Sequence, residues 1–253
     1  MVRIWSLGSS SRGNSFLIEC GETTVLVDAG FSARELERKL RSCGVEPAAV
    51  DAILISHEHV DHIRGAGRFA HRNGARVFCS PKVVRAVAGE FELDWSPLAA
   101  GEDVLVGGIR VHPFSVPHDA ADPFGLRIEA DGLSIAVCTD LGVPTPLVEY
   151  NLARSNVWLL ESNHDPDMLV GGPYPWHLKQ RIASEFGHLS NRAAAELIGR
   201  NAHDGLVAVM LVHISETNND PSLAYAAAAE ALGGNGLKLE VAHPTEPVKL
   251  LEI

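Results

Sequence analysis

The sequence predicts an α/β protein in which two mixed β-sheets pack face to face and helices cover their outer surfaces. Strand patterns come in runs, and helical patterns fall between and after these runs; this order is typical of helices packed outside sheets. Hydrophobic residues make up 46% of the 253-residue chain, enough for a sizeable core. No Pro- or Ser-rich linker divides the chain, so we expect one domain over residues 1–253.

In the first half, apolar runs separated by turn residues predict the strands. Ser32 and Glu35 have the spacing of a capping box, which predicts a helix start. The small residues at 8–15 predict a loop, and residues 91–108 are expected to be irregular. The predicted strands lie at residues 2–7, 16–20, 23–28, 50–56 and 76–79. The predicted helices lie at residues 33–42, 63–72 and 81–88.

The second half continues the same alternation. Asp131-Gly132 predicts a tight hairpin turn between two strands. The predicted strands lie at residues 109–116, 125–130, 133–139, 156–161, 206–212, 238–242 and 248–252. The predicted helices lie at residues 144–154, 173–186, 192–201 and 222–232.

Charge and cysteine content restrict the class of protein. The formal net charge is −11, which argues against a broadly basic nucleic-acid surface, although bound metal ions add positive charge that the count omits. The four cysteines form no C-x-x-C pair, so we expect reduced, buried thiols. The N-terminus has no signal-peptide pattern and no apolar run is long enough to span a membrane. These features predict a cytoplasmic location and no membrane partner.

Twelve histidines are many for this length, and three of them fall within six positions of one another. Residues 53–56 are the end of a predicted buried strand, and His57, His59, Asp61 and His62 follow at once. Buried imidazole and carboxylate groups must find partners. A divalent cation satisfies several of them at one point, so this segment predicts a metal site.

Three further predicted strands end in a group that can bind metal: His118, Asp140 and His213. Ligands at the ends of adjacent strands are held rigidly by the sheet. With the first cluster they make seven ligands, which is enough for two ions. The mixed His/Asp set suits zinc, manganese or iron.

The pattern His-x-His-x-Asp-His resembles the signature of the metallo-β-lactamase superfamily. That resemblance implies an αββα sandwich and a division of the ligands between two divalent ions. One ion would be held by His57, His59 and His118. The other would be held by Asp61, His62 and His213, and Asp140 would bridge the two.

Within the superfamily, the chain resembles the YycJ/WalJ-like group over nearly its whole length. The matching segments are residues 6–15, 57–62, 118–123, 139–142, 161–165, 172–181 and 213–219. Arg12 departs from the pattern, which has a Gly at this place in the Gly/Ser-rich loop. The resemblance implies a 5′-to-3′ exonuclease that acts on double-stranded DNA in DNA repair, with DNA as its partner.

The segment that begins at Gly187-His188 is similar to a ribonuclease Z segment, in which a histidine before a helix assists phosphodiester cleavage. His188 is therefore a candidate catalytic residue, together with Asp61, which could orient the attacking water and accept its proton. A helix N-terminus favours anions. The candidates for holding the substrate phosphate are His164, Ser190 and Asn191, with Arg12, Lys179 and Arg181 nearby.

Other functions remain open at this point, because the fold alone does not name a substrate. One alternative is a small-molecule thioesterase or lactonase of the glyoxalase type, and another is an RNA-processing nuclease. A non-enzymatic metal-bound scaffold or sensor is disfavoured by the intact ligand set. The sequence leaves the native metal and the oligomeric state undetermined.

Overall fold

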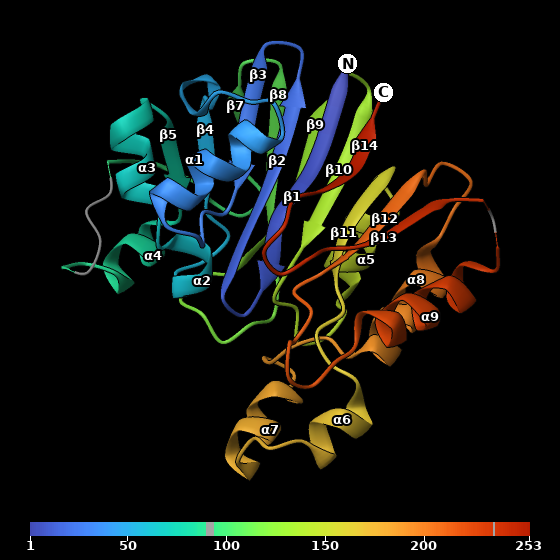
Figure 1. Ribbon diagram of the computed structural model, residues 1–253. Coiled ribbons are helices and arrows are strands. Elements are labelled where there is room, and N and C mark those ends of the chain that lie inside the picture. The colour runs from blue at the N-terminus through green and yellow to red at the C-terminus, as the bar shows by residue number, and fades with distance from the viewer. Residues whose placement is uncertain (90–93, 235) are drawn as a thin grey trace.

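A computed structural model describes residues 1–89, 94–234 and 236–253 of the protein. Two mixed seven-stranded sheets pack face to face, with helices outside, as predicted (Figure 1). The first sheet has the order β14-β1-β2-β3-β4-β5-β6, with β1 (Val2–Ser10), β2 (Gly13–Cys20), β3 (Thr23–Val27), β4 (Ala52–Leu54), β5 (Arg76–Cys79), β6 (Trp95–Pro97) and β14 (Val248–Glu252). The second has the order β13-β12-β11-β10-β9-β8-β7, with β7 (Val104–Val106), β8 (Ile109–Ser115), β9 (Phe124–Ala130), β10 (Leu133–Cys138), β11 (Val157–Glu161), β12 (Ala208–Val212) and β13 (Lys238–Val241).

The helices form separate layers (Figure 1). The first sheet is covered by α1 (Ala33–Ser42), the 3-10 turn η1 (Pro47–Ala49), α2 (Val60–Ile63), α3 (Ala66–Asn73) and α4 (Pro81–Ala86). The second is covered by α5 (Pro146–Leu152), α8 (Asn191–Asn201) and α9 (Pro221–Leu232). The short helices α6 (Pro166–Gly171) and α7 (Trp176–Ile182) lie beyond the strand ends. No helix among the described residues combines the length and apolar character needed to cross a membrane.

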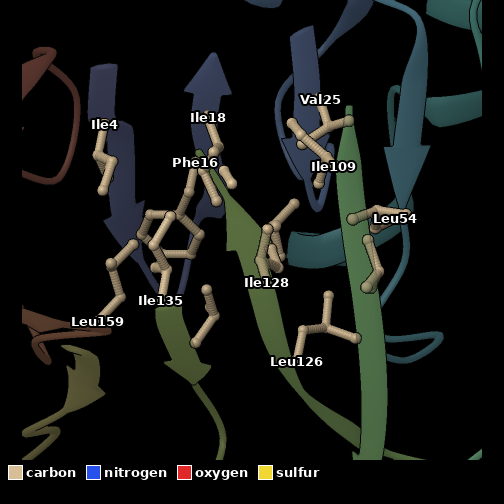
Figure 2. Close-up of a cluster of buried hydrophobic side chains, with 14 of the residues drawn as sticks. Ile4, Phe16, Ile18, Val25, Leu54, Ile109, Leu126, Ile128, Ile135 and Leu159 are labelled. Carbon is tan, nitrogen blue, oxygen red and sulfur yellow. The ribbon is translucent and has the colours of Figure 1, made fainter. Parts of the chain in front are cut away.

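The main core lies between the two sheets, and strand alternation creates it. Phe16 and Ile18 of β2 point toward the second sheet, whereas Leu17 points outward under the helices, because successive side chains of a strand face opposite sides. Figure 2 shows Phe16 against Ile135 and Leu159 from the opposite sheet. This packing fixes the two sheets relative to each other, and therefore fixes the strand ends.

The carboxyl ends of several strands meet at one edge of the sandwich. In the second sheet β10, β11, β12 and β13 are mutually parallel, and β8 runs the same way because β9 is antiparallel to both β8 and β10. In the first sheet β3, β4 and β5 are parallel. Side chains that follow these strands are therefore brought to a common edge from both sheets.

The predicted loop at residues 8–15 is wrong, because the two strands continue into it. Ser9 pairs with Asn14 and Ser10 with Gly13 across a two-residue turn. The small residues are required by close packing: a Cβ on Gly13 would lie 2.8 Å from the Phe31 ring. Low strand propensity hid this hairpin extension, and tertiary packing stabilises it.

Two other predicted segments are corrected. The helix predicted at 173–186 is only α7, Trp176–Ile182, and the neighbouring α6 was not predicted. The chain turns after α7 so tightly that a Cβ on Gly187 would lie 2.2 Å from the Ile182 carbonyl oxygen. The predicted irregular region contains β6 and β7, while its residues 91–93 lie outside the described residues.

Candidate active site and metal centre

The structure brings all seven predicted metal ligands to the common strand edge. Potential ligand atoms of His57, His59 and His118 lie within 4.8 Å of one another, and so do those of Asp61, His62 and His213. Asp140 lies between the two groups. Its Oδ1 is 3.6 Å from His118 Nε2, and its Oδ2 is 3.1 Å from His62 Nε2.

On the first-sheet side, buried contacts orient two histidines. The Nδ1 atom of His62 lies 2.7 Å from Asp28 Oδ2. Asp28 also accepts hydrogen bonds from the backbone nitrogen and the hydroxyl of Ser56, both at 2.8 Å. The same hydroxyl lies 3.0 Å from His57 Nδ1. Because their Nδ1 atoms are engaged in this way, His62 and His57 direct Nε2 into the cluster, as metal-binding histidines do.

On the second-sheet side, Glu161 and a backbone carbonyl act in the same way. Glu161 Oε1 lies 2.8 Å from Nδ1 of His213 and 2.8 Å from Nδ1 of His188. The Nδ1 atom of His118 lies 3.0 Å from the Gly187 carbonyl oxygen. An acceptor that is a carboxylate or a carbonyl requires Nδ1 to carry the proton. The Nε2 atoms of these histidines are therefore the ones left for the site.

Several buried atoms at the centre lack a hydrogen-bond partner among the described residues. They include His57 Nε2, His213 Nε2 and Asp140 Oδ2. Leaving such atoms buried and unpaired costs about 1–3 kcal/mol each. Imidazole nitrogens and carboxylate oxygens that converge are the donor set of a divalent transition-metal site. The residues present therefore fit the metal ions that the sequence pattern predicts.

Electrostatics keep the carboxylates of the cluster ionised. Burial opposes ionisation of Asp140, but His213 and His62 outweigh it and hold the pKa of Asp140 well below its ordinary value. In the same way His188 and His213 lower the pKa of Glu161 to about 2. Burial would lower the pKa of His213, but the carboxylates of Asp140, Asp61 and Glu161 raise it to about 10, so a metal ion that binds Nε2 must displace its proton. Ionised carboxylates are the form that binds cations.

A cavity of about 220 Å³ opens beside the cluster, and His188 and Asp61 both line it. Tyr174, Leu178 and Ile182, from α7 and the segment before it, form an apolar wall on another side. The His188 side chain is 21% exposed. The two predicted catalytic residues therefore line the same cavity, next to the ligand cluster.

The structure does not bring the three predicted phosphate-binding residues into this lining. Ser190 accepts a hydrogen bond from the Ala193 nitrogen and caps α8. The buried amide of Asn191 is hydrogen-bonded to Ser162 and Asn219. His164 is buried next to Ser190, and burial lowers its pKa to about 4. Side-chain contacts from Ser190 and Asn191 to a substrate phosphate thus have no support in the geometry.

Sequence reasoning missed three residues that organise the cluster. Asp28 and Glu161 orient histidines as described above. Asn14 Nδ2 donates to Asp61 Oδ2 at 3.2 Å and lies 3.0 Å from His62 Nε2. Asp28 and Glu161 each follow or end a strand, the same signal that identified Asp140.

A family model described as "Beta-lactamase superfamily domain" matches residues 23–214. The chain belongs to this superfamily. The match spans the ligand set from His57 to His213, and superfamily membership confirms the predicted metal-dependent hydrolase.

Two relatives indicate which group within the superfamily the chain resembles. Exodeoxyribonuclease WalJ of Streptococcus pneumoniae is 36% identical over 225 residues, covering 87% of this chain and 84% of WalJ. Exodeoxyribonuclease YycJ of Bacillus anthracis is 33% identical over 248 residues, covering 95% and 94%. The resemblance to the YycJ/WalJ group is thereby confirmed. The metallo-beta-lactamase fold protein YhfI of Bacillus subtilis has a TM-score of 0.75 at 14% identity, covering 98% of this chain and 99% of YhfI, which supports the fold alone.

Proposed function

We propose that this protein is a metal-dependent phosphodiesterase that removes nucleotides from 5′ ends of double-stranded DNA in DNA repair. The observation that carries the proposal is the His188–Glu161 contact of 2.8 Å at the cavity, directly beside the ligand cluster. It provides a proton donor next to a site for divalent ions. The names of the relatives supply the class of substrate. We further propose one catalytic domain over residues 1–253 and a cytoplasmic location.

Two ions are part of this proposal. His57, His59 and His118 would hold one, Asp61, His62 and His213 would hold the other, and Asp140 would contact both. The donor set suits zinc or manganese, and also iron. Such ions, when bound, neutralise charge on a phosphate and lower the pKa of water to near neutrality.

The chain's own residues contribute orientation and proton transfer. Asn14 holds one oxygen of Asp61, and the Asp61 side chain is 16% exposed toward the cavity. Its carboxylate orients the attacking water and accepts the proton that the water loses. His188 donates a proton from Nε2 to the oxygen that leaves the phosphorus. The ionised Glu161 accepts from Nδ1 of His188, which leaves Nε2 as the nitrogen that faces the leaving oxygen.

A 5′-labelled DNA duplex, incubated with manganese and with zinc, tests the proposal. The variant His188→Ala should keep both ions and lose about 10²–10⁴-fold in rate, the usual contribution of a general acid. With bis(p-nitrophenyl) phosphate the loss should be smaller, because p-nitrophenolate leaves without a proton. His112→Ala is the matched control, since His112 also contacts a carboxylate, Asp103, at 2.7 Å, and it does not line the cavity.

Three results would contradict the proposal. If protein that holds two ions leaves duplex DNA intact, it does not act on DNA; cleavage of RNA or of a thioester would then identify the alternatives. Release from the 3′ end would overturn the polarity. Equal losses with both substrates would remove His188 from the role of proton donor.

A further inference from the structure

The positively charged side chains near the cavity already form ion pairs or hydrogen bonds with other groups of the protein. Arg12 forms an ion pair with Glu216 at 3.0 Å. Lys179 donates to two backbone carbonyls at the end of α6, at 2.6 and 2.8 Å. Arg181 pairs with Asp119. The sequence favoured these three residues for phosphate contacts, but the phosphates of a long duplex need cations elsewhere on the surface.

Positive charge is concentrated in one part of the chain. Residues 33–89 contain ten Lys or Arg and six Asp or Glu, a net charge of +4, although the whole chain carries −11. This segment forms the helix layer α1–α4 over the first sheet (Figure 1). A segregated basic region in an acidic protein is typical of a surface that binds a polyanion.

A groove of about 940 Å³ lies on this basic layer, between α3 and the β5–β6 edge. Arg64, Arg68 and Arg76 line it and are exposed, together with the half-buried ring of Trp95. None of these arginines forms an ion pair with a carboxylate in the described part of the chain. Asp94 is the one carboxylate among the described lining residues.

The groove begins close to the ligand cluster. Arg64 caps the end of α2, three residues after Asp61. Arg64 lies in the turn between α2 and α3, and Arg68 lies in the first turn of α3. The eight residues of α3 extend about 12 Å, and Arg76 follows at the start of β5. The three arginines therefore line the groove from the end of α2, along α3, to the start of β5.

We infer that this groove binds the phosphate backbone of double-stranded DNA beyond the nucleotide that is cleaved. The inference rests on the proposed function, since it names where the remaining duplex lies. Unpaired guanidinium groups bind phosphates with paired hydrogen bonds and without sequence preference. The groove thus adds affinity for long duplexes and leaves the chemistry at the ligand cluster unchanged.

The test compares the metal-loaded wild-type protein with a triple variant, Arg64→Gln, Arg68→Gln and Arg76→Gln. Equilibrium binding of a 20-base-pair duplex with phosphorothioate ends is measured by fluorescence anisotropy at several salt concentrations. Each phosphate contact adds about 0.9 to the slope of log K against log salt. The slope should therefore fall by about 2 to 3, and duplex affinity at low salt should fall.

A second triple variant controls for total charge. Arg110→Gln, Arg154→Gln and Arg200→Gln also change the net charge from −11 to −14, but these exposed residues do not line the groove. This control should keep the wild-type slope. Lysine at the three groove positions should restore most of the slope, because charge is retained.

The outcomes separate this inference from the proposed function. Hydrolysis of bis(p-nitrophenyl) phosphate should be equal in all variants, which also verifies folding. If the wild type degrades duplex DNA and the groove variant keeps its slope and affinity, the groove is not the binding surface and the exonuclease proposal stands. If no variant degrades DNA but the groove variant alone loses duplex binding, the exonuclease proposal fails and the groove assignment stands.

Discussion

Replacing Asp28 by Asn tests whether a buried carboxylate sets the metal affinity of His62. Asp28 is fully buried, and its Oδ2 contacts both His62 Nδ1, at 2.7 Å, and the Ser56 hydroxyl, at 2.8 Å. Its Oδ1 accepts from the Ser56 nitrogen at 2.8 Å. An amide presents one oxygen and one NH2 group. In either orientation of the amide, its NH2 group faces at least one of these donors and cannot form a hydrogen bond with it.

The magnitude follows from the two ways in which the variant can respond. If His62 keeps its tautomer, a buried donor is left unpaired at a cost of about 1–3 kcal/mol of unfolding free energy. If His62 changes tautomer, Nε2 carries the proton and competes with a metal. Changes in residues that orient a metal-binding histidine cost about 10–100-fold in affinity, equivalent to about 1.4–2.7 kcal/mol. We therefore expect weaker binding of one ion and activity that returns at higher metal concentration.

Metal affinity is measured by competition with a chelating dye, and unfolding by urea titration. Asp51→Asn is the matched control, because Asp51 accepts from the Thr24 nitrogen at 2.8 Å in the same sheet but does not contact the cluster. It should keep wild-type metal affinity. If Asp28→Asn also binds both ions with wild-type affinity, Asp28 does not fix the His62 tautomer and the reasoning is refuted.

Four other predictions address the cluster and the core. Glu161→Gln should lower turnover more than tenfold, because one oxygen of Glu161 accepts from two histidines and the other from two backbone nitrogens, and an amide NH2 can replace neither oxygen; unchanged turnover with two ions bound would contradict this. Gly30→Ala should reduce metal content, measured by elemental analysis, because its Cβ would lie 1.6 Å from the Asp61 carbonyl oxygen; full metal content would argue against it. Leu159→Ala should lower the unfolding free energy by about 2–5 kcal/mol in urea titration, with unchanged activity per folded molecule. A smaller loss would mean that the core collapses into the space that the leucine side chain vacates. Metal at 100 times its Kd should stabilise the folded protein by about 2.7 kcal/mol, so removal of the metal by a chelator should lower Tm by about 5–10 °C. An unchanged Tm would show that no ion binds the folded state.

Local sequence patterns were sufficient for most of the strands and for the candidate ligands that the fold brings together, because both depend on short-range order. His57, His59, Asp61 and His62 are dense enough to exclude an ordinary loop, and Asp140 follows a strand of buried residues. Asp28 and Glu161 carry the same strand-end signal. A single carboxylate after a strand is common, however. Its hydrogen-bond partner can be identified only once the fold shows which strands are neighbours. These two positions were therefore recognisable only from tertiary structure.

The phosphate-binding predictions show a different limit of sequence reasoning. Ser190 and Asn191 precede a helix, and their side chains can bind an anion. The sequence does not reveal competing partners, and in the fold the α8 backbone and Asn219 take those groups. The Gly/Ser-rich hairpin was missed for the opposite reason. Its strands depend on packing against Phe31, which local propensity does not include.

Backbone geometry explains why the strand-end residues cannot easily be exchanged. Asp28, Asp140 and His213 have φ values of 61°, 51° and 54°, in the left-handed region that glycine adopts without strain. For other residues this region costs about 1–2 kcal/mol. Glycine would relieve that cost but would remove the carboxylate or imidazole that the cluster needs. The buried contacts of Asp28 and His213 offset this cost. The strained backbone is therefore retained, because it turns the chain sharply at the strand end and places the side chain at the shared edge.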